Sequence, residues 1–387
     1  MTLNKLPGLY YDEETEYELS GNGAKIPVII GPTGTSTGQH PQDGTSYLKY
    51  QTYEDACKVV TQGGIGTHPE TNPVLAFLKD FFEEAKPKNS EDLGVPYVYV
   101  IDLGTGTSKT AWTTALATAK TLTEATVEIY VAADNIEDYT LLSFLAGAME
   151  SIRAETHDLN LRCAYATKTD ATDAQLIALT SGTGAVNDSR LFIFEPLLFG
   201  KSCARFCCTP YYVEPGFLQY RSVKPDVFLQ RTKAQELALQ NAGVIFSHDE
   251  KVDTDIYTRI NLSTSSSFAL ASRPADALGH SRFNADNLLR QIFKAVYPQI
   301  KDNEAASNIV KRQTKVDAIV DAEVEAERII RYNSDTMEGT KLTLVESEHD
   351  PYDMELVGQI QPVNCTVAIN IKAYIKNPIV KTIAPDT

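Results

Sequence analysis

The sequence predicts an α/β protein in which helices cover a mixed sheet, followed by a smaller α+β domain. Strand-like apolar runs alternate with helical segments up to about residue 265. Beyond that point two long helical segments are followed only by strands. Both ends of the chain alternate with a period of two, which is typical of extended strands. We therefore expect an arm over residues 1–22, an α/β domain over 23–265, an α+β domain over 266–365 and a second arm over 366–387.

The first domain contains short apolar runs between turn residues, and these runs predict buried strands. The expected strands cover residues 25–31, 95–103, 126–132, 161–166, 190–196 and 244–247. Helices are expected over residues 72–85, 111–122, 141–156, 173–179 and 233–241. Asn72 is a natural N-cap with Pro73 in the first turn, and Gly243 is a natural C-cap residue. This order predicts a largely parallel or mixed sheet.

The second domain is expected to contain helices over 284–300 and 303–332 and strands over 341–346 and 354–361. A last strand over 366–376 belongs to the carboxyl-terminal arm. Its residues Val367, Ile369, Ile371, Ala373 and Ile375 share one face, and Lys372, Tyr374 and Lys376 lie on the other.

The amino-terminal arm shows the same alternation, with Glu14, Glu16 and Glu18 on one face and Thr15, Tyr17 and Leu19 on the other. A lone strand is unstable because its amides and carbonyls have no partners. Strand addition to another chain would satisfy them. The alternative is that both arms fold back onto their own domain.

Composition limits the possible partners. The 387 residues carry a net charge of −16, which argues against nucleic acid and against an anionic membrane surface as the main partner. The apolar runs are too short to cross a bilayer. The first residues, MTLNKLPGLYY, do not form a basic segment followed by an apolar one, so we expect no signal peptide and assembly in a host cytoplasm.

The sequence offers little for a cofactor or a catalytic site. Cys203, Cys207 and Cys208 lack the spacing and the nearby histidine of a zinc site, so buried reduced thiols are expected and no metal or other cofactor. The loop from Asp102 to Lys109 follows a strand, but it has no glycine directly before the lysine as a P-loop requires, and the loop over 31–38 has no lysine.

Ser247, His248 and Asp249 are adjacent along a strand, and adjacent strand residues point to opposite faces. We expect a polar strand end there, and a protein that is not an enzyme. The alternative is an α/β enzyme or nucleotide-binding protein of unknown substrate.

Several segments in order resemble contractile tail sheath proteins. These are PGLYY at 7–11, KIPVIIGP at 25–32, Phe81-Phe82 in a helix before VPYVYVIDL at 95–103, a long charged helix, and MELVGQIQP at 354–362. The resemblance implies a structural subunit of stacked six-membered rings around an inner tube. It also implies an outer first domain, an inner second domain and arms that add strands to neighbouring subunits. Contraction would drive the tube through a target envelope without nucleotide hydrolysis.

The same resemblance implies the partners and the location. The partners would be further copies of the chain, the inner tail tube protein, and the baseplate and tail terminator proteins. The location would be a virion tail or an injection-system particle. The candidate inter-subunit residues are Glu14, Glu16, Tyr17, Glu18, Val367, Ile369, Ile371, Lys372, Tyr374 and Lys376. The arms carry opposite charge, which favours pairing between them.

Glu323 and Glu327 are the candidate tube-facing residues. Ile309, Val316 and Val320 begin an apolar stripe on the long helix, and the two glutamates then occupy the same face. Unpaired carboxylates are costly to bury, so we expect this face to leave the core near Glu323. The face would then meet either water or basic groups, and the resemblance to sheath proteins implies basic groups of the tube. The alternative is a solvated helix end with Glu327 paired to Arg331.

Overall fold

A computed structural model describes most of the chain between Lys25 and Val363. The described residues are 25–33, 44–58, 72–87, 93–104, 109–122, 124–131, 163–166, 171–181, 185, 188–223, 231–252, 255–261, 263, 265–268, 278–296, 306–346 and 354–363. Both arms, and the helix expected over residues 141–156, lie outside these ranges.

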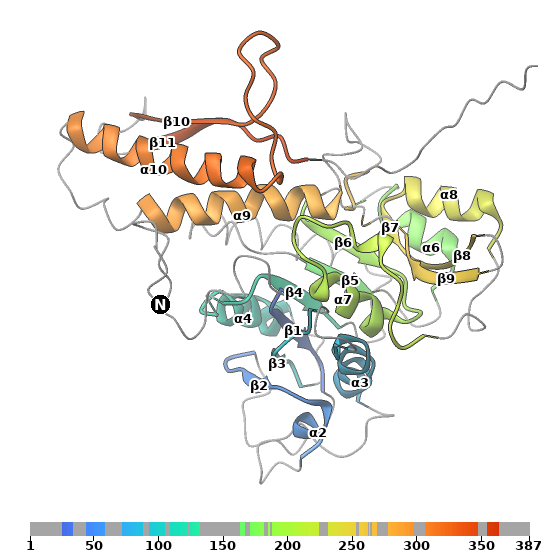
Figure 1. Cartoon of the computed structure of the whole chain (residues 1–387). Helices are drawn as coiled ribbons and strands as arrows, with labels where there is room; N and C mark the ends of the chain where they lie inside the picture. The colour runs from blue at the N-terminus through green and yellow to red at the C-terminus, as the bar shows by residue number, and fades with distance from the viewer. Residues whose placement is uncertain are drawn as a thin grey trace, which may run out of the picture.

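A seven-stranded sheet forms the centre of the first part of the molecule (Figure 1). Its strands are β1 (Pro27–Gly31), β2 (Leu48–Tyr50), β3 (Val98–Asp102), β4 (Val127–Tyr130), β5 (Cys163–Ala166), β6 (Leu191–Phe194) and β7 (Val244–Ile245). Their order across the sheet is β2-β3-β1-β4-β5-β6-β7. All neighbours are parallel except β2 and β3, so the predicted mixed sheet is confirmed.

Two helical layers cover the sheet, and each makes its own core. Helices α2 (Tyr53–Ala56), α3 (Pro73–Ala85) and α7 (Phe199–Cys208) pack on one face. Helices α4 (Lys109–Ala119), α6 (Asp173–Ala178) and α8 (Lys233–Asn241) pack on the other. Side chains alternate in direction along a strand, so one strand contributes to both cores. In β1, Ile29 lies in the first core, and Val28 and Ile30 lie in the second.

Side-chain caps fix several helix starts. Asn72 Oδ1 accepts a hydrogen bond from the Leu75 amide at 3.0 Å, as expected for the N-cap before Pro73. Thr172 and Thr232 each begin a helix with a reciprocal capping box. Gly243 follows α8 with φ +75°, the left-handed conformation that ends a helix.

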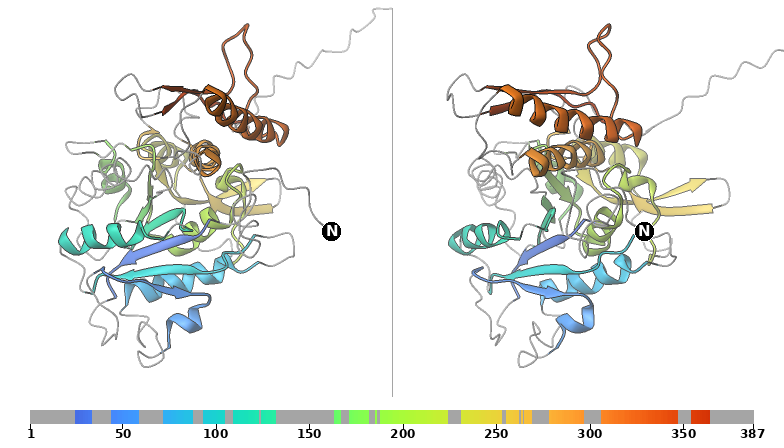
Figure 2. Two further views of the ribbon diagram at one scale, coloured as in Figure 1. Left: turned by 90° about the vertical axis from the view of Figure 1, so that its left-hand side faces the viewer. Right: turned by 60° about the vertical axis from the view of Figure 1, so that its left-hand side comes forward.

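A hairpin and a second unit follow the sheet. Strands β8 (Ser247–Val252) and β9 (Asp255–Ile260) pair antiparallel. Helix α9 (Gly279–Val296), helix α10 (Ala306–Glu325) and the antiparallel strands β10 (Lys341–Glu346) and β11 (Met354–Gln359) form the unit that we call the carboxyl-terminal unit. Figure 2 shows α9 lying between the sheet and α10, with β10 and β11 beyond α10.

The carboxyl-terminal unit has a core of its own. The members of this third core are Leu288, Ile292, Ala295, Val316, Ile319, Ile329 and Leu342. Helix α9 joins the two parts of the molecule, because Phe283 near its start packs in the first core and Leu288 in the third. A buried carboxylate strengthens the joint: Asp286 accepts bonds from Arg190, which precedes β6, and from Arg282, both at 3.0 Å.

Several described elements differ from expectation. Strands β2 and β9 and helix α2 were not predicted. Helix α9 begins five residues before the predicted residue 284, and α10 ends at Glu325 rather than near 332. Helix α7 was not predicted, because Lys201, Arg205 and three cysteines hide its apolar pattern. All ten of its residues are buried, and the two cations pair with Glu83 and Glu84 of α3.

Candidate functional site

The end of α10 shows where the sequence interpretation of the tube-facing residues fails. Helix α10 closes with a Schellman motif, in which Arg328 N donates to Glu323 O and Glu327 N donates to Val324 O, each at 3.0 Å. Glu327 is the residue in the left-handed conformation, with φ +57°. It follows that Glu323 and Glu327 do not share a helix face, because the helix has ended between them.

Glu323 lies inside the subunit and does not face outward. The residue is 4% exposed, and its carboxylate accepts hydrogen bonds from Gln291 Nε2 at 2.9 Å and Tyr211 Oη at 3.4 Å. Arg328 Nη1 pairs with it at 3.2 Å and also donates to Tyr211 Oη. Burial and the neighbouring carboxylate raise the pKa of Tyr211, which keeps its hydroxyl protonated. The expectation that the helix leaves the core at Glu323 is therefore wrong.

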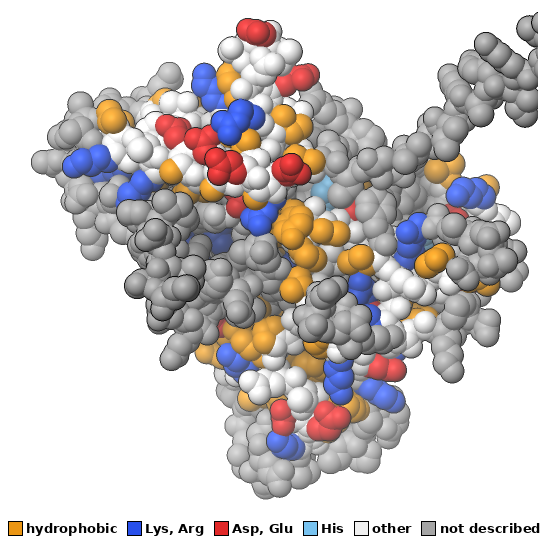
Figure 3. Space-filling view, viewed as in Figure 1, with side chains coloured by type: hydrophobic (Ala, Val, Ile, Leu, Met, Phe, Trp, Pro, Cys, Tyr) orange, Lys and Arg blue, Asp and Glu red, His pale blue; other side chains and the backbone are white. Residues whose placement is uncertain are grey.

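The exposed charges lie beyond Glu323. Among the described residues, no ion pair is formed by the exposed side chains of Glu325, Glu327, Asp335 and Glu338, which we call the acidic end. Arg331 pairs with Asp321 at 2.9 Å rather than with Glu327. Figure 3 shows acidic side chains gathered over α10 and the loop that projects from it.

The segment over residues 326–340, which we call the projecting loop, connects α10 to β10 (Figure 1). Hydrogen bonds within the loop and to the residues after β11 hold it. Asn333 N donates to Glu338 O at 2.8 Å, and Gly339 N donates to Gln361 Oε1 at 2.6 Å. Met337 lies near its tip and is 67% exposed. The loop thus presents acidic groups and an apolar side chain in a fixed arrangement.

The sheet made by β10 and β11 contains two strands, which we call the hairpin sheet. Two-stranded sheets are marginal by themselves, and this one rests on α10 through Leu342 in the third core. The predicted arm residues, from Glu14 to Glu18 and from Val367 to Lys376, lie outside the described residues, so their contacts stay predictions.

The carboxyl edge of the large sheet is the place where an α/β enzyme would bind a ligand. Asp102, at the end of β3, is buried and its Oδ1 accepts hydrogen bonds from Gly104 N at 2.7 Å and Thr33 N at 3.3 Å, so it ties two loops together.

Residues 34–38 have the sequence pattern G-x-S-x-G, which the sequence interpretation missed. A nucleophile elbow requires a helix directly after the strand. Residues 34–43 lie outside the described residues, and the next described element after β1 is β2.

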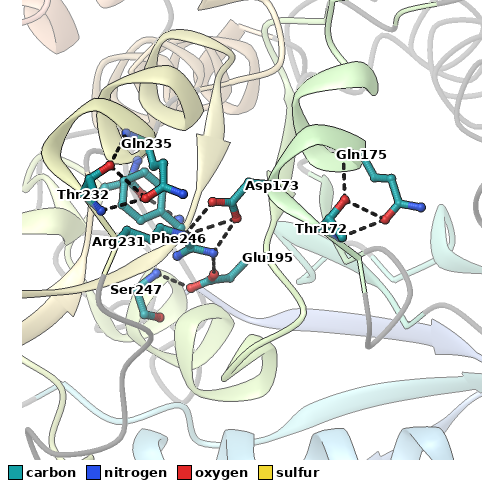
Figure 4. A network of polar contacts seen from close by, with 10 residues as sticks. Thr172, Asp173, Gln175, Glu195, Arg231, Thr232, Gln235, Phe246 and Ser247 are labelled. Atoms are coloured by element: carbon teal, nitrogen blue, oxygen red, sulfur yellow. Dashed lines mark hydrogen bonds and ion pairs between the residues drawn. The ribbon is translucent and has the colours of Figure 1, made fainter.

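A buried ion-pair network stands at the end of β6 (Figure 4). Arg231 Nη2 bonds Glu195 at 2.8 Å and Asp173 at 2.9 Å, and its guanidinium lies 5.4 Å from the Phe246 ring centre. Burial raises the pKa of Glu195, while Arg231 acts in the opposite direction. Glu195 also accepts from Ser247 N, so it joins β6 to the start of β8. The contacts are those of a structural network.

Ser247, His248 and Asp249 do not form a catalytic relay in the described structure. They lie in β8, as the predicted polar strand requires. Ser247 Oγ bonds Tyr220 Oη at 2.8 Å, and Asp249 accepts from Thr258 Oγ1 at 2.5 Å. Burial and nearby cations lower the pKa of His248 to about 4.

The cysteines of α7 are buried free thiols, which confirms their predicted state. Cys203 and Cys207 are fully buried and Cys208 is 3% exposed. Burial raises the pKa of all three, that of Cys208 to about 11. In the part of the chain that the structure describes, no group of three His, Cys, Asp or Glu side chains is arranged to hold a metal ion.

No described helix combines the length and the apolar character that a membrane span requires.

Comparison with known proteins shows that the fold is similar to that of proteins from contractile particles. No protein-family model matches the chain, and no curated protein matches it by sequence. Among solved structures, a chain of the anti-feeding prophage baseplate is similar over 97% of this chain and 100% of its own, with 12% identity and a TM-score of 0.65. The contracted helical sheath of the same prophage is similar over 96% and 99%, with 12% identity and a TM-score of 0.64.

A crystal structure of a sheath tail protein is also similar. The crystal structure of the sheath tail protein from Desulfitobacterium hafniense is similar over 92% of this chain and 96% of its own, with 11% identity and a TM-score of 0.56. The chain therefore has the fold of contractile sheath proteins, from the large sheet through the carboxyl-terminal unit.

Proposed function

We propose that this chain is the structural subunit of a contractile sheath, which polymerises as stacked rings around an inner tube and contracts to drive that tube through a target envelope. The observation that carries the proposal is the likeness over 96% of this chain to a contracted helical sheath, which includes the carboxyl-terminal unit as well as the sheet. The particle would be a phage tail or a related injection system, and its baseplate would be a further partner.

The arms are proposed to join the subunits. The hairpin sheet has only two strands among the described residues, and each arm is an alternating strand in sequence. Adding an arm strand to the hairpin sheet of a neighbour would satisfy backbone groups on both sides. Each ladder hydrogen bond contributes about 1 kcal/mol net, so several bonds repeated through a lattice give a stable polymer.

Deletion of residues 366–387 tests this proposal. The deletion leaves every described residue in place, so we expect a folded, soluble protein that forms no tubes. Electron microscopy of the full chain, with circular dichroism as the control for folding, measures the result. Normal tubes from the shortened chain would contradict the role of the arm. Discrete particles from the full chain under all assembly conditions would contradict the sheath itself.

The acidic end is proposed to meet the tube, with Glu327 as its tested residue. Glu323 is excluded because its carboxylate is buried against Arg328. Fixed, exposed acidic groups favour a basic partner surface and set the rate and specificity of association.

The test of this tube contact is Glu327→Lys, with Glu54→Lys on the exposed surface of α2 as the control of equal charge change. We expect tube-free polymers from both variants and about threefold to tenfold weaker association of the purified tube with Glu327→Lys alone. Equal tube association in a pull-down assay would exclude Glu327 from the contact.

A further inference from the structure

Charge is unevenly distributed along the two helices of the carboxyl-terminal unit. The acidic end lies at the last turn of α10 and in the projecting loop, whereas basic residues lie in the first half of α10 and the last turns of α9. Figure 3 shows Lys and Arg side chains at the opposite end of α10 from the acidic ones. The residues that we call the basic end are Arg290, Lys294, Lys311 and Lys315.

The packing of α9 on α10 brings these basic residues to one end of the helix pair. Lys315 Nζ donates to Ala295 O, in the last turn of α9, at 3.4 Å, and Lys311 lies one turn before Lys315 on the same side of α10. On α9, partial burial and the nearby Arg290 lower the pKa of Lys294. The cations therefore disfavour one another, and an acidic group beside them would relieve this repulsion.

The neighbouring sequence does not cancel the charge of the basic end. The connection between the two helices, residues 297–305, contains one lysine and two acidic residues, which gives it a net charge of −1 against the four basic residues. In α10, the Asp317 carboxylate accepts a hydrogen bond from Gln313 at 2.7 Å, and Asp321 pairs with Arg331. The basic end is therefore a positive site on a chain whose net charge is −16.

The chain itself contains an acidic segment that complements this site. Residues 12–18, which we call the acidic segment, hold five carboxylates and neither lysine nor arginine. In an extended chain Glu14, Glu16 and Glu18 share one side and span about 13 Å. The cations lie on two packed helices, whose axes are about 8–10 Å apart in general. The two sets of charges therefore match in sign and in size.

The acidic segment is attached close to the same helix pair. Lys25, the first described residue, places its ammonium 4.6 Å from the ring centre of Phe283, near the start of α9. Helix α9 rises by about 16 Å between Phe283 and Lys294. Glu18 is seven residues before Lys25, and an extended chain of that length reaches about 24 Å. The acidic segment can thus reach the basic end of its own subunit.

The tether decides which copy supplies the acidic segment to a free subunit. A short linker gives the two groups that it joins an effective concentration in the millimolar range, about a thousandfold above that of other copies at micromolar concentration. We infer that the acidic segment of the free subunit binds the basic end of its own chain, and that this contact is released when the subunit assembles. Only the release rests on the proposed sheath function, in which the same segment contacts a neighbour.

Carbodiimide cross-linking of the free subunit tests the docking. The reagent condenses a carboxylate with a lysine amine in contact with it, and the water lost on forming the amide converts the carbodiimide to a urea. An equal mixture of unlabelled and ¹⁵N-labelled chains, at micromolar concentration, would be cross-linked and digested for mass spectrometry. Links from residues 12–18 to Lys294, Lys311 or Lys315 are expected within chains of one isotope. Links to Lys79 and Lys86, both exposed on or beside α3, should be at least about tenfold rarer.

A charge-removing variant gives a second measurement. Lys311→Gln with Lys315→Gln should speed cleavage of the acidic segment by a glutamate-specific protease about threefold to tenfold. About 0.5 M salt should have the same effect on the unchanged chain, because exposed charges are then screened. The matched control is Lys79→Gln with Lys86→Gln, and circular dichroism checks the fold of both variants.

A variant of the acidic segment leaves every described residue in place. Changing Glu14, Glu16 and Glu18 to Gln should reduce the remaining links from Asp12 and Glu13 to the basic end about fivefold or more. The same change should shorten the delay before polymerisation, measured by light scattering, because no docked segment has to be released.

Three results would overturn the inference. These are links only between chains of different isotope, links to Lys372, Lys376 or Lys381 in place of the basic end, and equal cleavage rates in the two lysine variants. Intrachain links to the basic end in a chain that never forms tubes would support the docking and contradict the proposed function.

Discussion

Glu327 shows how a single residue can end a helix without a glycine. Its left-handed conformation costs an ordinary residue about 1 kcal/mol, which glycine would avoid. Glu327→Gly is therefore expected to raise the free energy of unfolding by roughly 0.5–1 kcal/mol, measured by urea denaturation. Glu325→Gly, within the last turn of α10, is the matched control and should lower it by about 1 kcal/mol. A loss of stability in both variants would contradict the cap.

The same residue explains why the sequence could not predict the tube-facing side. Glycine or asparagine would have marked the end of α10, and without either the charged pattern continues to Tyr332. Glu323 was also misinterpreted, because its partners Tyr211 and Gln291 are distant in sequence. Burial of a carboxylate depends on such partners, and sequence periodicity carries no information about them.

Helix α7 is the element in which polar composition and burial conflict most. Lys201 and Arg205 enter the core because Glu83 and Glu84 of α3 meet them, and Gly200 allows the approach, since a Cβ there would lie 2.7 Å from Phe77 O. Most of the other described helices were predicted from caps and apolar spacing, although the short helix α2 was not. Helix α7 depends on complementary charges in a helix more than 100 residues earlier.

The cysteine thiols of α7 should react very slowly while the protein is folded. Cys203, Cys207 and Cys208 are buried with raised pKa values, and thiolate is the reactive form. Maleimide labelling read by mass spectrometry should show them reacting at least roughly 100-fold more slowly than the half-buried Cys57. The difference should vanish in denaturant. Native labelling as fast as that of Cys57 would mean that α7 opens readily.

For the whole molecule, the sequence predicted the α/β class and most strands, because each buried strand is a compact apolar run. The order β2-β3-β1-β4-β5-β6-β7 was not predictable, since it depends on which strands pair. Strand β2 was not predicted, because three residues carry too little pattern.

The opposite charges of the two arms are expected to act between copies of the chain. Lys372→Glu with Lys376→Glu should raise the protein concentration needed for assembly about fivefold at low salt, and less at high salt. Lys79→Glu with Lys86→Glu, both exposed on or beside α3, controls for the change in net charge. Light scattering against concentration measures the threshold. Combining the arm variant with Glu14, Glu16 and Glu18 changed to Lys should restore part of the loss. No recovery would argue against direct pairing of the arms.

The attachment of the hairpin sheet to α10 has a mechanical consequence. Gln313 of α10 donates from Nε2 to Leu342 O at 3.0 Å and accepts at Oε1 from Leu344 N at 2.8 Å. These two bonds and the third core together fasten the hairpin sheet to α10. A pulling force on β10 would therefore be passed to α10, and through α9 to the large sheet, before the two strands could peel away.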